Sequence, residues 1–287
     1  MPSLRELRSK IKSVKSTQQI TKAMKMVAAA RLRRAQSRIL SARPFALKME
    51  ELMTDVMRRM GPDHPHPLTR IRDGHQRVVL LVTSDKGLCG AFNTNLIRET
   101  VRYIQKYQAV NVKLFVVGRK GRDYFKRIGI PVVKDYTNIF NNLGFQHAEI
   151  ITADLLQAFE NPATQAVDLI YAEFKSVVQQ RVIVKPLLPL SAPSAEKGEG
   201  SSIDFIYEPA KEILIEGLIL RFLKAQVFRI LLESAASELG ARMSAMENAT
   251  KNASELMESL TLTLNRSRQA SITKEILEVV SGAEALK

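Results

Sequence analysis

The 287-residue sequence has one cysteine, no tryptophan and no long apolar run. Because Cys89 stands alone, no intrachain disulfide can form, which favours a reducing compartment. No stretch of about 18 apolar residues is present, so we expect the chain not to span a membrane. The N-terminus, MPSLRELRSK, lacks the apolar core of a secretory signal. These absences exclude disulfide-stabilised and integral membrane proteins.

Acidic residues are scarce in the first part of the chain. Residues 1–48 contain thirteen Lys or Arg and a single acid, Glu6, which gives a formal charge of +12. The whole chain carries +14, so the excess is concentrated there. Such a charge predicts an acidic partner, which could be nucleic acid, an anionic membrane or an acidic protein surface.

The N-terminal segment, residues 1–60, has the pattern of a long helix. Ser3 and Glu6 form a capping-box sequence. A seven-residue repeat follows, mostly apolar but polar in the middle at Gln18, Thr21 and Lys25. Pro44 is expected to bend or interrupt the helix. Residues 61–76, which include His64 and His66, are interpreted as a proline-rich linker and not as a metal site.

The C-terminal segment, residues 209–287, has a stronger repeat. Twelve of fourteen heptad positions between Leu218 and Leu264 are apolar, which is typical of a coiled coil. The exceptions are Arg229 and Thr250. We therefore predict a second long helix.

The middle segment, residues 77–190, alternates short apolar strands with amphipathic helices. Strand-like runs such as RVVLLVTS and VKLFVVG precede helical stretches. This order predicts a mostly parallel, Rossmann-like α/β domain. Residues 191–208 are polar and are predicted to be a loop. Because one domain separates two long helices, the fold class is an antiparallel coiled coil of N- and C-terminal helices plus a central α/β domain.

The best candidate for a chemical site is the loop SDKGLCGAFN, residues 84–93. It follows a strand, precedes a helix and contains Gly87 and Gly90, so a phosphate could bind at the helix N-terminus. It matches neither GxGxxG nor the P-loop pattern, and GRKG at 118–121 matches neither. A tight structural turn is the alternative interpretation. Cys89 has no nearby histidine in the sequence to activate it. We therefore assign no catalytic, cofactor-binding or metal-ligating residue.

Nucleic-acid binding is the other alternative, because of the basic N-terminus. However, the basic residues are distributed around the predicted helix, and no aromatic residue precedes Phe45. The stretch ITKAMKMVAAARLRRAQSR at 20–38 is also apolar on more than one side. This combination favours a helix that protein encloses on several sides, with acidic residues on the enclosing surface.

Several stretches resemble the γ subunit of F-type ATP synthases. They are RSKIKSVKSTQQITKAMKMVAAARL, TSDKGLCGAFN, LLPL, SELGARMSAMENATKNASE and NRSRQASITKEILEVVSGA, which occur in the family's order along the whole chain. The resemblance implies a rotor that turns inside a ring of α and β subunits and couples proton flow to ATP synthesis. It also implies that the catalytic residues belong to β and that this chain holds no cofactor.

The resemblance further implies partners and contact residues. Met24, Lys25 and Arg242 are expected near an acidic loop of β, and Arg268, Gln269 and Thr273 at a second β contact. The final residues, 278–286, resemble the tip that an apolar bearing of the ring holds. The α/β domain is expected to contact the ε subunit and the c-subunit ring.

One departure from the chloroplast members bears on regulation. Those proteins carry an inserted pair of cysteines, whereas this chain has only Cys89. We therefore expect no thiol switch. With no transit peptide either, the sequence favours a bacterial protein, peripheral on the cytoplasmic side of the cell membrane, that meets the membrane only through its complex and binds no nucleic acid.

Overall fold

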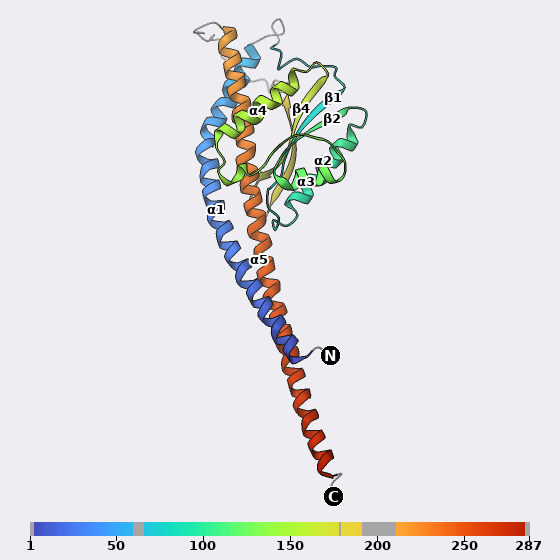
Figure 1. The fold of residues 1–287 in the computed structure, drawn as a ribbon. Helices are drawn as coiled ribbons and strands as arrows, with labels where there is room; N and C mark the ends of the chain where they lie inside the picture. The colour runs from blue at the N-terminus through green and yellow to red at the C-terminus, as the bar shows by residue number, and fades with distance from the viewer. Residues whose placement is uncertain (1–2, 60–65, 178, 191–210, 285–287) are drawn as a thin grey trace. The chain divides into compact units, whose positions relative to one another are not determined.

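The computed structural model describes residues 3–59, 66–177, 179–190 and 211–284 (Figure 1). In chain order, one long helix precedes a five-stranded sheet and another follows it: α1 spans Leu4–Arg59 and α5 spans Lys211–Glu284. The predicted loop at 191–208 lies outside the described residues, as do the last three residues of the chain. Contacts divide the chain into two units. We name them the paired-helix unit, Met1–Ala29 with Arg242–Lys287, and the sheet unit, Ala30–Ala241.

The helix α1 begins with the capping box that the sequence predicts. The Glu6 amide donates to Ser3 Oγ at 3.2 Å, and the Ser3 amide donates to the Glu6 carboxylate at 3.3 Å. These bonds satisfy amide groups that have no partner within the first helical turn. The start of the helix is therefore fixed locally.

Pro44 is expected to bend or interrupt the helix. An interruption is wrong, because α1 continues through this residue, and a bend stays a prediction. Proline lacks an amide hydrogen, so the Leu40 carbonyl loses its usual partner. Both residues are exposed, and water can therefore bind that carbonyl. Met49 and Met53, on the opposite side of the helix, are buried, and this packing holds the helix after the proline.

The sheet has the strand order β3-β2-β1-β4-β5. The first four strands are parallel and β5 pairs antiparallel with β4. In chain order the strands are β1 (Gln76–Val82), β2 (Asn111–Val117), β3 (Val132–Tyr136), β4 (Thr164–Phe174) and β5 (Gln180–Leu188). This is the mostly parallel α/β arrangement that the alternating pattern predicts.

Helices cover both faces of the sheet in the sheet unit. On one face, α2 (Phe92–Lys106) and α3 (Arg119–Arg127) pack over Val79 and Leu81. On the other, α4 (Phe145–Glu160) packs over Val78 and Leu80, together with parts of α1 and α5. Because both faces are covered, the central strands are mostly apolar, and residues 78–82 of β1 are fully buried.

The heptad positions of both long helices are buried or half-buried throughout the described residues. In the paired-helix unit, Leu7, Ala28, Met246 and Ala253 are among the most buried. In the sheet unit, the same repeat contributes Leu32 and Leu232 to the buried set. The seven-residue pattern therefore predicted the correct face of each helix.

Candidate functional site

The loop after β1, residues 84–91, is held together by its own polar groups. Asn93, in the first turn of α2, accepts from the Ser84 amide at 3.0 Å and donates to Cys89 Sγ at 3.2 Å. The Ser84 hydroxyl donates to the Lys86 carbonyl at 2.7 Å. Cys89 is only 1% exposed. These contacts fill the space inside the turn, so the geometry supports a structural connection more than a ligand cradle.

A carboxylate of the chain already occupies the N-terminus of α3. Asp85 accepts from the Arg119 amide at 3.2 Å and from the Asn138 amide at 3.0 Å. A helix N-terminus attracts anions because its first amides lack partners. Here the side chain of Asp85 satisfies one of them and brings a negative charge to the place where a phosphate would bind. This arrangement disfavours a nucleotide at the GRKG turn.

The glycines of that turn are required by packing. Gly118 has φ +91°, and a Cβ at this position would collide with the Thr83 carbonyl. Gly121 lies against the Thr83 side chain and donates its amide to Thr83 Oγ1 at 3.0 Å. Close approach of α3 to the end of β1 therefore explains both glycines without a ligand.

The paired-helix unit brings together the polar heptad residues of α1 and α5. Lys25 Nζ lies 2.6 Å from Glu247 Oε1. Gln18 donates to Ser254 Oγ at 2.6 Å, and Thr250 donates to Thr21 Oγ1 at 2.8 Å. These cross-helix pairs show that the two helices run antiparallel in this unit. Glu247 is a residue that the heptad analysis missed, because it lies beside the apolar positions.

The six residues that resemblance assigns to a β contact fall into two groups on the helices. Met24, Lys25 and Arg242 are half-buried, whereas Arg268, Gln269 and Thr273 are exposed on α5. Glu247, the partner of Lys25, and Arg268 are separated by about 30 Å of helix at 1.5 Å per residue. The structure therefore separates the two groups and does not form one continuous site.

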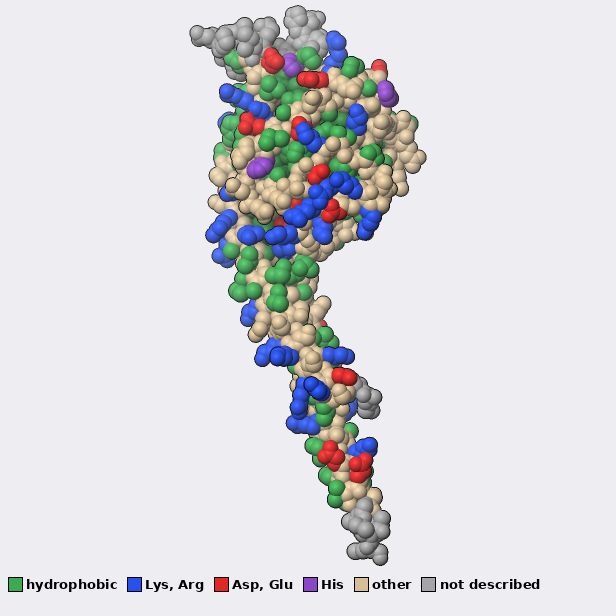
Figure 2. Space-filling view, in the orientation of Figure 1, with side chains coloured by type: hydrophobic (Ala, Val, Ile, Leu, Met, Phe, Trp, Pro, Cys, Tyr) green, Lys and Arg blue, Asp and Glu red, His purple; other side chains and the backbone are tan. Residues whose placement is uncertain are grey.

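The end of α5 extends beyond the start of α1. Gln18 meets Ser254 and Lys25 meets Glu247, so an antiparallel pair brings Leu4 opposite a residue near Arg268. Later residues of α5 have no α1 residue opposite them among those described. Ile272, Ile276 and Val279 are 48–72% exposed there. Figure 2 shows apolar side chains at the surface of this end of α5, between charged ones.

The sequence itself indicates that the C-terminal end of α5 lacks a partner helix. After Leu264 the heptad positions become polar, as Ser267, Ser271 and Lys274 show. The apolar residues Ile272 and Ile276 lie off those positions. Similarly, Ile20, Met26 and Val27 of α1 lie off the heptad and are 54–60% exposed. These apolar side chains are therefore available to another protein and not to the partner helix.

Comparisons with known proteins agree with this geometry. The family model described as ATP synthase matches residues 3–286. The ATP synthase gamma chain of Anaeromyxobacter sp. strain Fw109-5 is 50% identical over the full length of both chains, and that of Moorella thermoacetica is 44% identical, also over the full length.

Solved structures give the same result. A chain from the central stalk and c-ring structure of the Tetrahymena thermophila mitochondrial ATP synthase is 29% identical, with a TM-score of 0.61, and the match covers 80% of this chain and 99% of that one. A chain of the Euglena gracilis enzyme is 22% identical and supports the fold, with a TM-score of 0.70 over 99% of this chain and 94% of that one. From its sequence and its fold, the chain belongs to the ATP synthase gamma chain family.

Proposed function

We propose that this chain is the central rotor shaft of an F-type ATP synthase, which couples ion-driven rotation to ATP synthesis on neighbouring subunits. Membership of the gamma chain family supports this role. The observation on the molecule that carries it is the end of α5, where apolar side chains are exposed on a helix that has no α1 residue opposite it. A helix of this kind is stable when another protein surrounds it.

The proposed contacts with the β subunits are the two groups of residues on the helices. Met24, Lys25 and Arg242 form one contact region, and Arg268, Gln269 and Thr273 form the other. The separation of about 30 Å along α5 fits two distinct contacts on a long surrounding surface. The α subunits complete the ring in this proposal.

The chain itself is non-catalytic in this proposal, and ATP is made on β. The filled loop at 84–91 and the Asp85 carboxylate at α3 support this assignment, because they leave little space and an unfavourable charge for a phosphate. Among the described residues, no group of three His, Cys, Asp or Glu side chains is arranged to hold a metal ion. No cofactor is proposed.

The proposal places the chain at the cytoplasmic side of a bacterial membrane, as a peripheral part of the complex. The sheet unit would contact the ε subunit and the c-subunit ring. Within the part of the chain that the structure describes, none of the helices is long and apolar enough to cross a bilayer. Membrane attachment would therefore come from the partners.

Purification of the tagged chain from its host, with an ATPase assay, tests this function. We expect α and β to co-purify in excess over the tagged chain, together with ε and the c subunit, in a fraction that hydrolyses ATP. A lone chain without ATPase activity would contradict the proposal. Recovery with nucleic acid would instead revive the binding alternative suggested by the basic N-terminus.

A further inference from the structure

Lys25 differs from the other cations at the start of α1. The basic residues of segment 3–29 are Arg5, Arg8, Lys10, Lys12, Lys15, Lys22 and Lys25. All except Lys25 are exposed, and none of these others forms an ion pair with a side chain that the structure describes. Lys25 is half-buried, and its ammonium donates to Glu247 Oε1 at 2.6 Å. Within this segment, the charge of Lys25 is therefore the one that a described residue of the chain neutralises.

Lys25 occupies an inward position of the helix pair, where a charge needs a partner. Its neighbours on the same side of α1, Thr21 and Ala28, are 8% and 1% exposed. A lysine at such a position can pack its carbon stem along the interface while the ammonium stays at the edge. Glu247 lies at that edge, next to the buried Met246, and its side chain is 54% exposed. The ion pair thus forms at the border between the helix interface and the surface.

Two hydrogen bonds fix which residues of the two helices face each other here. Thr250 donates to Thr21 Oγ1 at 2.8 Å, and Gln18 donates to Ser254 Oγ at 2.6 Å. The ion pair of Lys25 comes one turn further along the same antiparallel register. A shift of the register would break all three contacts, so Lys25 has a defined partner.

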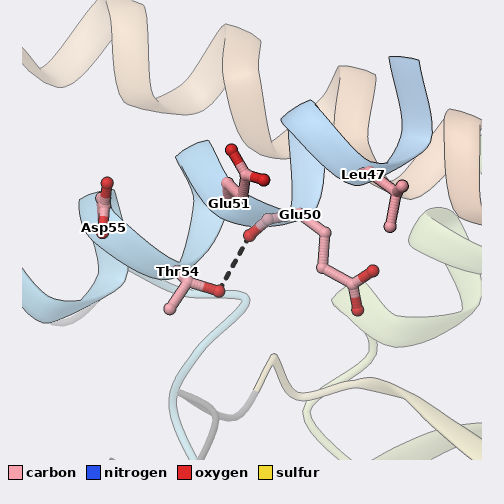
Figure 3. A pocket seen from close by; sticks show the side chains of 5 residues that line it. All are labelled: Leu47, Glu50, Glu51, Thr54 and Asp55. Atoms are coloured by element: carbon pink, nitrogen blue, oxygen red, sulfur yellow. Dashed lines mark hydrogen bonds between the residues drawn. The ribbon is translucent and has the colours of Figure 1, made fainter. Parts of the chain in front are cut away.

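The acids of α1 offer Lys25 no alternative partner. Glu6 is the single acid of residues 1–48, and its carboxylate is used in the capping box. The next acids, Glu50, Glu51 and Asp55, come 25 or more residues after Lys25 and line an open hollow in the sheet unit (Figure 3). Neutralisation of the lysine therefore depends on its partner in α5.

The ion pair changes what a neighbouring protein meets at position 25. The proposed function places the region around Met24 and Lys25 against an acidic part of β. A free ammonium would bind such a surface strongly, whereas an ammonium paired with a carboxylate presents no net charge to it. A turning shaft has to release each β contact before it makes the next one. A weak contact at this place therefore favours rotation.

We propose that Glu247 is a positioning residue, which holds the Lys25 ammonium on the shaft and so weakens its binding to β. It acts through Lys25 and not by a contact of its own with the ring. The inference rests on the proposed function, because it requires an acidic surface of β at this place. It adds a residue that is not among the six proposed β contacts.

Substitutions in the complete complex, reconstituted into vesicles, test the proposal. Glu247→Gln frees the lysine, and we expect ion-driven ATP synthesis per assembled complex to fall about threefold, an effect of the size that one exposed ion pair can have. The double variant Glu247→Gln with Lys25→Gln removes the freed cation and should recover most of that loss. The matched control is Glu255→Gln, which removes an acid of α5 whose partner, Lys251, lies on the same helix. It should leave synthesis at the wild-type rate.

Salt dependence gives a second readout, which a purely structural role would not change. Salt screens the attraction between a freed Lys25 and an acidic surface. The deficit of Glu247→Gln relative to the wild type should therefore shrink as the KCl concentration rises. Glu255→Gln should follow the wild type at every concentration.

The outcomes separate this inference from the proposed function. If the double variant is as deficient as Glu247→Gln, the pair only holds the helices together and the inference is wrong. Wild-type synthesis in Glu247→Gln would overturn it as well. In both cases the rotor function stands, because the complex assembles and makes ATP. If no complex containing α and β can be purified with the wild-type chain, the function itself fails.

Discussion

At the scale of single residues, a buried ion pair anchors the beginning of the sheet. Arg77 of β1 lies 2.8 Å from Asp168 of β4, and both side chains are largely buried. The Tyr103 hydroxyl donates to the same carboxylate, and the Arg77 guanidinium lies 4.3 Å from the centroid of the Tyr107 ring. Burial, with the bond to Asp168, raises the pKa of Tyr103 well above its usual range, so the phenol stays neutral.

We expect Asp168→Ala to lower the free energy of unfolding by about 3–5 kcal/mol, because Arg77 is then left as a buried charge without its partner. Denaturant unfolding of the isolated chain measures this. The control is Glu255→Ala, which removes an exposed pair with Lys251 and should change the free energy by less than about 1 kcal/mol. Equal effects of the two substitutions would show that the buried pair has no special role.

A second prediction at this scale concerns Met24. The substitution Met24→Lys adds a cation next to Lys22 and Lys25 in the region that we propose faces an acidic part of β. The added lysine should bind that acidic surface too strongly and so lower the coupling efficiency. This is measured as the rate of proton-driven ATP synthesis, or as the number of protons pumped per ATP hydrolysed. Met24→Leu keeps the volume without the charge and should behave like the wild type. Wild-type coupling in Met24→Lys would refute the assigned contact.

At the scale of elements, periodicity predicted the helices better than it predicted the turns. The heptads of α1 and α5 identify their buried faces, and the apolar runs identify β1 and β2. The sequence does not reveal that Asp85 caps α3, because Asp85 and Arg119, whose amide it accepts, are 34 residues apart in the chain. The loop at residues 84–93 was open to a phosphate-binding interpretation until its internal hydrogen bonds, among them those of Ser84 and Asn93, were known.

Two glycines in turns, Gly118 and Gly129, test this view, and Gly217 inside α5 serves as the comparison. Gly118→Ala should lower the free energy of unfolding by about 2 kcal/mol or more, since a positive φ is combined with a collision at the Thr83 carbonyl. Gly129 also has a positive φ but open space around it, so Gly129→Ala should cost about 1 kcal/mol.

Gly217 lies inside α5 with open space around it. Gly217→Ala should therefore raise the free energy of unfolding by about 0.5–1 kcal/mol. Thermal or denaturant unfolding of the three variants gives the order, and a Gly118→Ala protein as stable as the wild type would show that α3 can move away from β1.

At the scale of the whole molecule, the sequence predicted two long helices and a sheet but not the division into units. The boundary between the two units falls within both long helices, after Ala29 in α1 and after Ala241 in α5. The heptad continues across these points because it records only which face is buried. In the sheet unit that face packs with the apolar core of the sheet, as Leu232 shows, whereas in the paired-helix unit it packs on the other helix. Periodicity cannot distinguish the two surroundings.

The end of α5 provides the last prediction. Deletion of residues 270–287 removes side chains that, where described, are mostly exposed, so the melting temperature of the isolated chain should change little. Coupled ATP synthesis and assembly of the complex should nevertheless weaken, because the deleted helix is the part that we propose the ring encloses. The pair Val279→Asp and Val280→Asp keeps the length and should give a similar loss. Undiminished coupled synthesis in both variants would mean that the apolar end of α5 transmits no torque. The shaft would then act through the proposed contacts that both variants keep, which are Met24, Lys25, Arg242, Arg268 and Gln269.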